Sequence, residues 1–75
     1  MDYNHYNIAM NIVLNGQPKT LSGPTSVSAL IEALGYTGKR IAVERNGEIV
    51  PKSTYAGTQL EAGDRLEIVV AVGGG

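Results

Sequence analysis

The chain has 75 residues, no cysteine, and six Lys or Arg residues against seven Asp or Glu residues, which gives a net charge of −1. These values exclude a disulfide framework and a thiolate metal site, and they argue against a nucleic-acid-binding protein, which normally carries a concentrated basic face. The hydrophobic content of 43% is typical of globular proteins, so we expect one small domain stabilised by ordinary packing.

The first nine residues, MDYNHYNIA, are polar and lack the basic start and the apolar core of a signal peptide. We expect residues 1–9 to be a flexible N-terminal extension. No apolar run approaches the roughly 20 residues that span a bilayer, so we expect no membrane association. The absence of cysteine suits a reducing compartment, and we expect a cytoplasmic protein.

The run MNIVLNG at residues 10–16 alternates in polarity and predicts a β-strand that ends in an Asn15-Gly16 turn. The short run PKTLS at residues 18–22 then returns as the second arm of a hairpin. Because Pro18 has no amide hydrogen, this second strand is expected at a sheet edge, or with the proline as its first residue.

The segment SGPTSVSALIEALGY predicts one amphipathic helix. Thr25 or Ser26 can accept a backbone hydrogen bond as the N-cap, and Gly35 stands where a left-handed residue ends a helix. Four apolar residues recur at helical spacing and form one stripe: Val27, Leu30, Ile31 and Leu34. The stripe must lie across a sheet.

The segment KRIAVERNGEIVP predicts a strand, an Asn46-Gly47 turn and a short strand that ends at Pro51. The following residues, KSTYAGTQLEAGD, are expected to be irregular, with Tyr55 and Leu60 closing the open end of the core.

The run RLEIVVAV predicts the last strand, with alternate residues on opposite faces. Leu66, Ile68 and Val70 point one way, and Val69 and Ala71 point the other. A strand that is apolar on both faces is usually central, or half covered by a partner.

This order of elements predicts an α+β domain of the β-grasp type, in which a mixed sheet of four to five strands packs on one helix. The first and last strands are expected to lie side by side. We place the domain at residues 10–72 and a flexible glycine-rich tail at residues 73–75.

The sequence offers no catalytic constellation. The only histidine, His5, lies in the polar leader, and no cysteine can act as a nucleophile. Glu44 and Glu48 flank a turn and are expected to be solvated, while Asp64 is expected to bond local backbone. We therefore expect neither an enzyme nor a metal site.

The remaining functional group is the carboxylate after Gly73, Gly74 and Gly75. A carboxylate is nucleophilic enough to attack the α-phosphate of ATP when an enzyme holds both, and the resulting acyl adenylate can accept sulfur. Glycines allow such a tail to thread a narrow channel. The alternative is a frayed end or a linker remnant without a role.

The motifs MNIVLNG, TSVSALIEALG, IAVERNGEIVP and AGDRLEIVVAVGGG together resemble the ThiS-type sulfur carriers of bacterial thiamine biosynthesis. The resemblance runs from about residue 10 to residue 75. It implies that Gly75, the end of a di-glycine with Gly74, is adenylated by a ThiF-type enzyme that uses ATP and magnesium. A sulfur-donor relay would then form a thiocarboxylate and supply a ThiG-type thiazole synthase, with no cofactor bound to the carrier.

An exposed apolar area near the tail would suit the docking of these enzymes. We expect Val69, Ala71 and Val72 to form it, with Arg45 and Arg65 as possible sources of charge complementarity. The alternative is that neighbouring strands cover these residues.

Two other carriers and one non-carrier remain as alternatives. The carriers are a molybdopterin-synthase small subunit and a thiocarboxylate donor for another pathway, such as a cysteine or siderophore route. The non-carrier is a passive β-grasp interaction module whose tail is unused. In each case we expect a monomer when the protein is free.

Overall fold

The computed structural model describes residues 9–72; residues 1–8 and 73–75 lie outside the described part. The predicted N-terminal extension therefore falls almost wholly outside it, and the predicted tail, residues 73–75, falls outside it completely. The elements in chain order are β1 (Met10–Leu14), β2 (Gln17–Leu21), α1 (Val27–Ala33), β3 (Ile41–Arg45), β4 (Glu48–Ile49), the 3₁₀ helix η2 (Lys52–Gly57) and β5 (Arg65–Val70).

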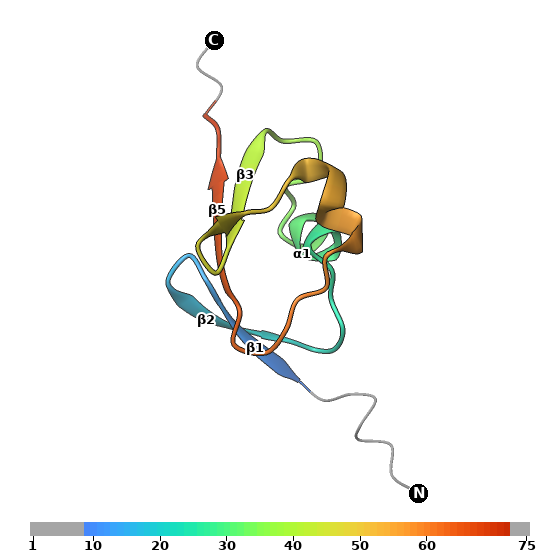
Figure 1. Ribbon diagram of the computed structural model, residues 1–75, viewed down its shortest axis with the longest axis vertical. Coiled ribbons are helices and arrows are strands. Elements are labelled where there is room, and N and C mark those ends of the chain that lie inside the picture. The colour runs from blue at the N-terminus through green and yellow to red at the C-terminus, as the bar shows by residue number, and fades with distance from the viewer. Residues whose placement is uncertain (1–8, 73–75) are drawn as a thin grey trace, which may run out of the picture.

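The strands form one five-stranded sheet in the order β2-β1-β5-β3-β4. β1 and β5 are parallel and adjacent, and the other pairs are antiparallel. The α-helix α1 packs against one face of this mixed sheet (Figure 1). The predicted β-grasp fold is confirmed, and Pro18 lies in the edge strand β2, where its missing amide hydrogen costs no sheet hydrogen bond.

Both Asn-Gly pairs form the hairpin turns predicted from the sequence. Asn15 and Gly16 have φ values of 51° and 81°, and Asn46 and Gly47 have φ values of 52° and 87°. Two successive positive φ values define the type I′ turn, whose twist matches that of the flanking strands.

Asn15 has a second role between β1 and β5. The two strands pair directly at two positions, Val13 with Arg65 and Leu14 with Leu66. Beyond them the Asn15 side chain replaces a peptide group: its Oδ1 accepts from Ile68 N at 2.8 Å and its Nδ2 donates to Ile68 O at 3.2 Å. The parallel ladder therefore ends on a side-chain amide.

The helix begins and ends as expected. Ser26 is the N-cap, and its Oγ accepts from Ala29 N at 3.0 Å. Gly35 has a φ of 79°, and Tyr36 N donates to Ile31 O at 3.0 Å, so the last carbonyls of the helix are satisfied by the residues that follow it.

The core lies between α1 and the sheet, and it includes three residues of the predicted helical stripe, while Leu34 is half-buried at the helix end. Its buried apolar members are Ile12, Leu21, Val27, Leu30, Ile31, Val43, Val50, Leu60, Leu66 and Ile68.

One expectation was wrong. Part of the segment predicted to be irregular forms the 3₁₀ helix η2, because Thr54 N and Thr54 Oγ1 both donate to the carbonyl of Pro51, at 2.9 and 2.8 Å. The expected closure of the core is confirmed: Leu60 is buried and Tyr55 packs half-buried against the core.

Candidate functional site

β5 is the central strand of the sheet. It starts beside the β3–β4 turn, runs through the centre of the sheet, and leads toward the C-terminal residues (Figure 1). One residue past its end, Ala71 N donates to Arg40 O at 2.8 Å. This bond holds the backbone at residue 71, so the chain leaves the fold from a defined position. Gly73, Gly74 and Gly75 lie outside the described residues.

The predicted alternation of β5 is present. Leu66 and Ile68 are buried, and Val70 is half-buried on the helix side. Val69 is 63% exposed and Val72 is 91% exposed. Neighbouring strands therefore do not cover Val69 on the face opposite the helix, and Val72 is exposed beyond the end of β5, which removes the alternative that these residues are shielded within the sheet.

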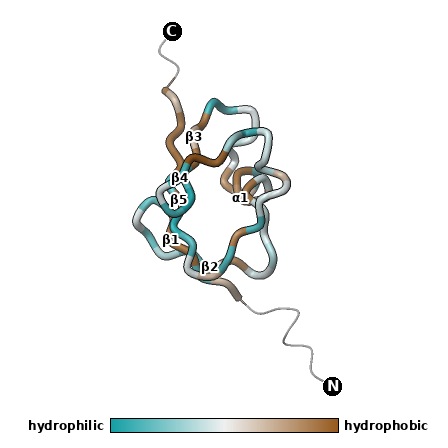
Figure 2. The backbone as a smooth tube through the Cα atoms, in the orientation of Figure 1, coloured by the Kyte–Doolittle hydropathy of each residue, from teal (hydrophilic) through white to brown (hydrophobic). Residues whose placement is uncertain are grey.

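A fourth exposed apolar residue lies beside Val69. Ala42 of β3 is exposed and lies directly opposite Val69 in the register of β3 and β5. We call Ala42, Val69, Ala71 and Val72 the apolar patch. Figure 2 shows the apolar colouring of this region continuing along the chain toward residue 72. The sequence analysis missed Ala42, although the alternation of IAVER around the buried Val43 would have placed it on this face.

An acidic pair borders the apolar patch. Glu44 and Glu67 lie directly opposite one another on β3 and β5, two positions along from Ala42 and Val69. Both are exposed, as expected for Glu44, and they line a hollow of about 480 Å³ together with Asn46, Gly47 and Arg65. Like charges in directly opposed positions destabilise a sheet.

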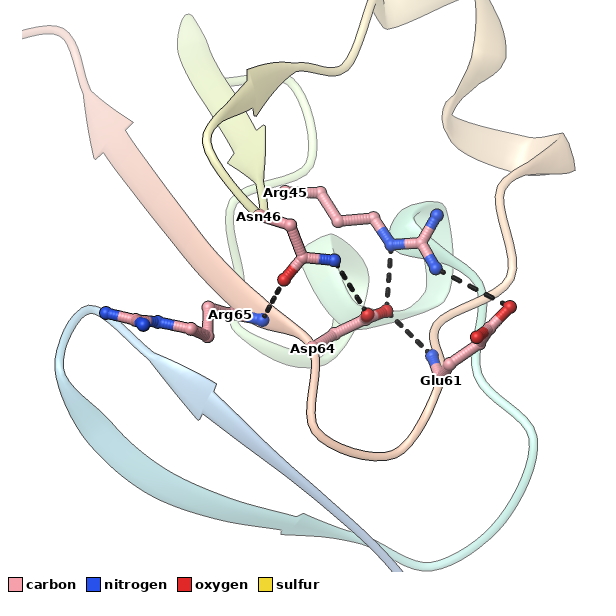
Figure 3. Close-up of polar contacts among 5 residues, drawn as sticks. All are labelled: Arg45, Asn46, Glu61, Asp64 and Arg65. Atoms are coloured by element: carbon pink, nitrogen blue, oxygen red, sulfur yellow. Dashed lines mark hydrogen bonds and ion pairs between the residues drawn. The ribbon is translucent and has the colours of Figure 1, made fainter.

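A polar network occupies the other end of β5 (Figure 3). Asp64 is 6% exposed, and its side chain accepts from Arg45 Nε at 2.8 Å, from Asn46 Nδ2 at 3.0 Å and from Glu61 N at 2.8 Å. Asn46 Oδ1 accepts in turn from Arg65 N at 2.9 Å. We call these contacts the Asp64 network; they tie the start of β5 to the β3–β4 turn.

The network sets the ionisation of Asp64. Burial alone would raise the pKa of this carboxyl, but the hydrogen bonds from Asn46, Glu61 and Arg45 and the charge of Arg45 outweigh it, so its pKa lies below the ordinary 3.8. Asp64 is therefore an ionised structural anchor. The local backbone contact expected for it is present, and the side-chain contacts were not foreseen.

The two arginines considered for charge complementarity differ in position. Arg45 is bound to Asp64, with a longer ion pair of 3.8 Å to Glu61, so its charge is used within the fold. The Arg65 side chain extends away from the network, toward the β1–β2 hairpin (Figure 3). Of the two, Arg65 alone remains on the exposed face of the sheet beside the acidic pair.

The rest of the described chain holds no cluster of candidate metal ligands. Between residues 9 and 72, no three His, Cys, Asp or Glu side chains are grouped so as to hold a metal ion, and every buried side-chain polar atom has a hydrogen-bond partner. Neither helix within that range has the length and apolar character needed to cross a membrane.

A comparison with protein families identifies the chain. A model of the ThiS family matches residues 12–75. This match includes the sheet apart from the first two residues of β1, the helix, the apolar patch and the three glycines.

Curated relatives fall into two groups. Thiazole synthase from Paramagnetospirillum magneticum is 48% identical over 66 residues, which cover 88% of this chain and 20% of that protein. Thiazole synthase from Magnetococcus marinus is 38% identical, and the match again covers 88% of this chain and 20% of that protein. This chain therefore spans about a fifth of the length of both proteins. The uncharacterized protein ycf40 from Pyropia yezoensis is 38% identical over 95% of this chain and 97% of that protein.

Solved structures agree with the family match. A crystal structure of a thiamine biosynthesis protein (ThiS) from Geobacter metallireducens is 33% identical with a TM-score of 0.75, covering 88% of this chain and all of that one. A solution structure of a thiamine biosynthesis protein from the same organism gives a TM-score of 0.74.

Proposed function

This chain belongs to the ThiS family, and on that premise we propose that it is a sulfur carrier for thiamine biosynthesis and not itself an enzyme. The observation that carries the proposal is the structural likeness to a thiamine biosynthesis protein, with a TM-score of 0.75. The match covers the full length of that protein. The described residues support it, because they form a packed core and leave apolar side chains exposed beside the segment that leads to the tail.

The reactive group in this proposal is the carboxylate of Gly75. One of its oxygens attacks the α-phosphate of ATP, bound with magnesium on a ThiF-type enzyme, so that a P–O bond forms and pyrophosphate leaves. Hydrosulfide sulfur, supplied by a donor relay, then attacks the activated carbonyl. The carbon–oxygen bond to AMP breaks, and the products are a thiocarboxylate, AMP and a proton.

The fold would serve this chemistry by presenting the tail. Ala71 is held to Arg40 by a backbone hydrogen bond, and Gly73 and Gly74 separate that region from the reactive residue. Glycine residues have no Cβ atoms, so they can pass through a channel too narrow for other side chains. The enzyme would recognise the packed domain and receive the tail in its active site.

The apolar patch is the surface that we propose for docking. Val69 and Val72 are two of the three large apolar side chains that stand exposed among the described residues, the third being Ile49. A cluster of exposed apolar residues beside a functional segment is typical of a protein interaction site. Because the patch adjoins the base of the tail, a partner that covers it would also be placed to bind residues 73–75.

The relatives support a ThiG-type thiazole synthase as one partner. In two proteins named thiazole synthase, a segment similar to this chain forms part of the same polypeptide. The sulfur of the thiocarboxylate would be delivered to that enzyme for construction of the thiazole ring.

Intact mass spectrometry tests the proposal. The purified chain is incubated with ATP, magnesium, hydrosulfide and the ThiF-type enzyme from the same genome. We expect a mass increase equal to the replacement of one oxygen by sulfur, and fragmentation should place it at Gly75. A chain that lacks Gly75 should remain unmodified, whereas Ala29→Asp, which alters an exposed helix position away from the tail, should be modified normally. An unchanged mass of the intact chain, with an enzyme that is active in ATP–pyrophosphate exchange, would overturn the proposal.

A further inference from the structure

A second hollow lies on the helix side of the sheet, between the end of α1, the start of β3 and the start of η2. Its volume is about 340 Å³, within the range of roughly 300–1,000 Å³ that is typical of small-molecule sites. The sulfur-carrier chemistry proposed above uses none of its side chains.

One wall of this hollow is apolar. Ile31, Ile41, Tyr36 and Tyr55 line it, and all four are buried or half-buried against the core. The two tyrosines come from segments far apart in the sequence, the loop after α1 and the 3₁₀ helix η2. Two rings and two branched aliphatic side chains provide the surface on which a flat aromatic group packs.

The rim of the hollow is positively charged. Lys39, Arg40 and Lys52 line it, which is half of the six Lys and Arg residues of the whole chain, and Glu32 is the one acidic residue among the lining groups. The ion pairs found among residues 9–72 are made by Arg45, so no carboxylate of that part of the chain lies at contact distance from the three cations at the rim. In a chain with a net charge of −1, this is a local concentration of positive charge.

The backbone around the hollow is fixed. Gly35 N donates to Glu32 O and Lys39 N donates to Tyr36 O, at 3.0 and 2.9 Å. The carbonyl of Arg40 accepts from Ala71, so the rim is also bonded to the segment from which the tail departs. A ligand would therefore find a site that is already formed, next to the base of the tail.

We propose that this hollow binds a small aromatic phosphate monoester. The ring packs on Tyr36, Tyr55 and the two isoleucines, and the phosphate faces Lys39, Arg40 and Lys52. The three cations exceed the one carboxylate by two charges, and a phosphate monoester carries about −1.5 to −2 at neutral pH. The phosphate of such a ligand suits the positively charged rim, and its ring suits the apolar wall. The site does not depend on the carrier function, so each can fail without the other.

The test is an NMR titration of the full chain labelled with ¹⁵N, using three probes: phenyl phosphate, inorganic phosphate and phenol. We expect phenyl phosphate to shift the amides of Ile31, Gly38 and Tyr55 in a saturable way. Its affinity should exceed that of either fragment by about tenfold or more, because one molecule fills both halves of the site.

Two matched variants locate the binding. The double substitution Lys39→Gln, Lys52→Gln should lower the affinity for phenyl phosphate about tenfold or more while leaving phenol unaffected, because each lost charge removes one contact to the phosphate. Arg65→Gln removes an exposed cation on the opposite face and should change nothing. Both variants replace exposed side chains, and unchanged dispersion of the spectra verifies their folding.

Three results would overturn the proposal. The first is the absence of saturation by phenyl phosphate. The second is equal affinity for inorganic phosphate, which would show an unspecific anion effect. The third is tighter binding of an acidic peptide that contains an aromatic residue than of phenyl phosphate, which would assign the hollow to a protein segment.

Discussion

The two ends of β5 differ in both the polarity and the exposure of their side chains. At its start, the charged Asp64 is buried, and its carboxylate accepts hydrogen bonds from Arg45, Asn46 and Glu61. Just past its end, the apolar side chains of Val69 and Val72 are exposed to solvent. The buried end is polar and the exposed end is apolar.

This contrast predicts which end of β5 stabilises the fold and which end binds another molecule. A buried carboxylate is tolerated because its hydrogen bonds replace those of water, and their directions fix the position of the β3–β4 turn relative to β5. Exposed valines contribute little to folding at their own positions, since they remove little apolar area from water. The first end should therefore respond to mutation in stability, and the second in binding.

Replacement of the anchor should have the largest effect. Asp64→Ala leaves the Arg45 guanidinium and the Glu61 and Asn46 amides without their acceptor, so we expect the free energy of unfolding to fall by about 3 kcal/mol. Urea unfolding followed by circular dichroism measures it. Glu61→Gln alters only the long contact of an exposed side chain and should cost well under about 1 kcal/mol. Equal losses in the two variants would refute the anchor role.

Charging the apolar patch should affect binding and spare the fold. Val69→Asp or Ala71→Asp places a charge where a partner would exclude water, and we expect affinity for the ThiF-type enzyme to drop about tenfold or more, as for the loss of a central interface contact. Surface plasmon resonance provides the affinity, and the urea midpoint provides the stability. Ala29→Asp adds the same charge on the helix and serves as the control. Normal adenylation of the patch variants would contradict the docking role.

Acid should weaken the buried end of β5. The folded pKa of Asp64 lies below its ordinary 3.8, so its contribution to stability is complete above that pH. The contribution declines as the pH falls below about 4 and is lost once the pH passes the folded value. Comparing urea midpoints of the wild-type chain and Asp64→Asn across this range isolates the effect. The two pH profiles should converge at low pH, and parallel profiles would show that Asp64 is not the group responsible.

The smallest expected effect is a gain. Glu44 and Glu67 repel one another across β3 and β5, so Glu67→Gln should raise the free energy of unfolding by about 0.2–1 kcal/mol at neutral pH and low salt. Added salt should reduce the difference, because exposed charges are screened. Glu48→Gln, at an exposed position in the edge strand β4, is the matched control. A loss of stability in Glu67→Gln would mean that this carboxylate makes a favourable contact that outweighs the repulsion.

Local signals in the sequence predicted most of the fold. Asn15-Gly16 and Asn46-Gly47 identified both hairpins because few residue pairs accept two positive φ values. Ser26 and Gly35 marked the limits of the helix, and the alternation of β5 identified Val69 as an outward residue. Each of these inferences depends on neighbours within a few positions along the chain.

The missed features depend on contacts that only the folded chain creates. Arg45 and Asp64 are separated by 19 positions, and nothing near either residue indicates that they meet. The hollow beside α1 likewise joins Tyr36 to Lys52 and Tyr55 from a separate segment. The exposed pairing of Ala42 with Val69 required the strand register. The reactive Gly75 was inferred from the sequence and lies outside the described residues, so its role stays a prediction.

The side-chain amide of Asn15 affects how the last part of β5 is hydrogen-bonded. It takes the place of a β1 residue opposite Ile68, and β1 itself has already ended at Leu14. Successive backbone amides of a strand point to opposite neighbouring strands. The amide of Val69 points to β3, where Ala42 is its partner, whereas the amide of Val70 points to the side of β1, which has already ended. Hydrogen exchange with heavy water should therefore be slow at Val69 and fast at Val70, so that β5 is protected along one margin only where the chain departs.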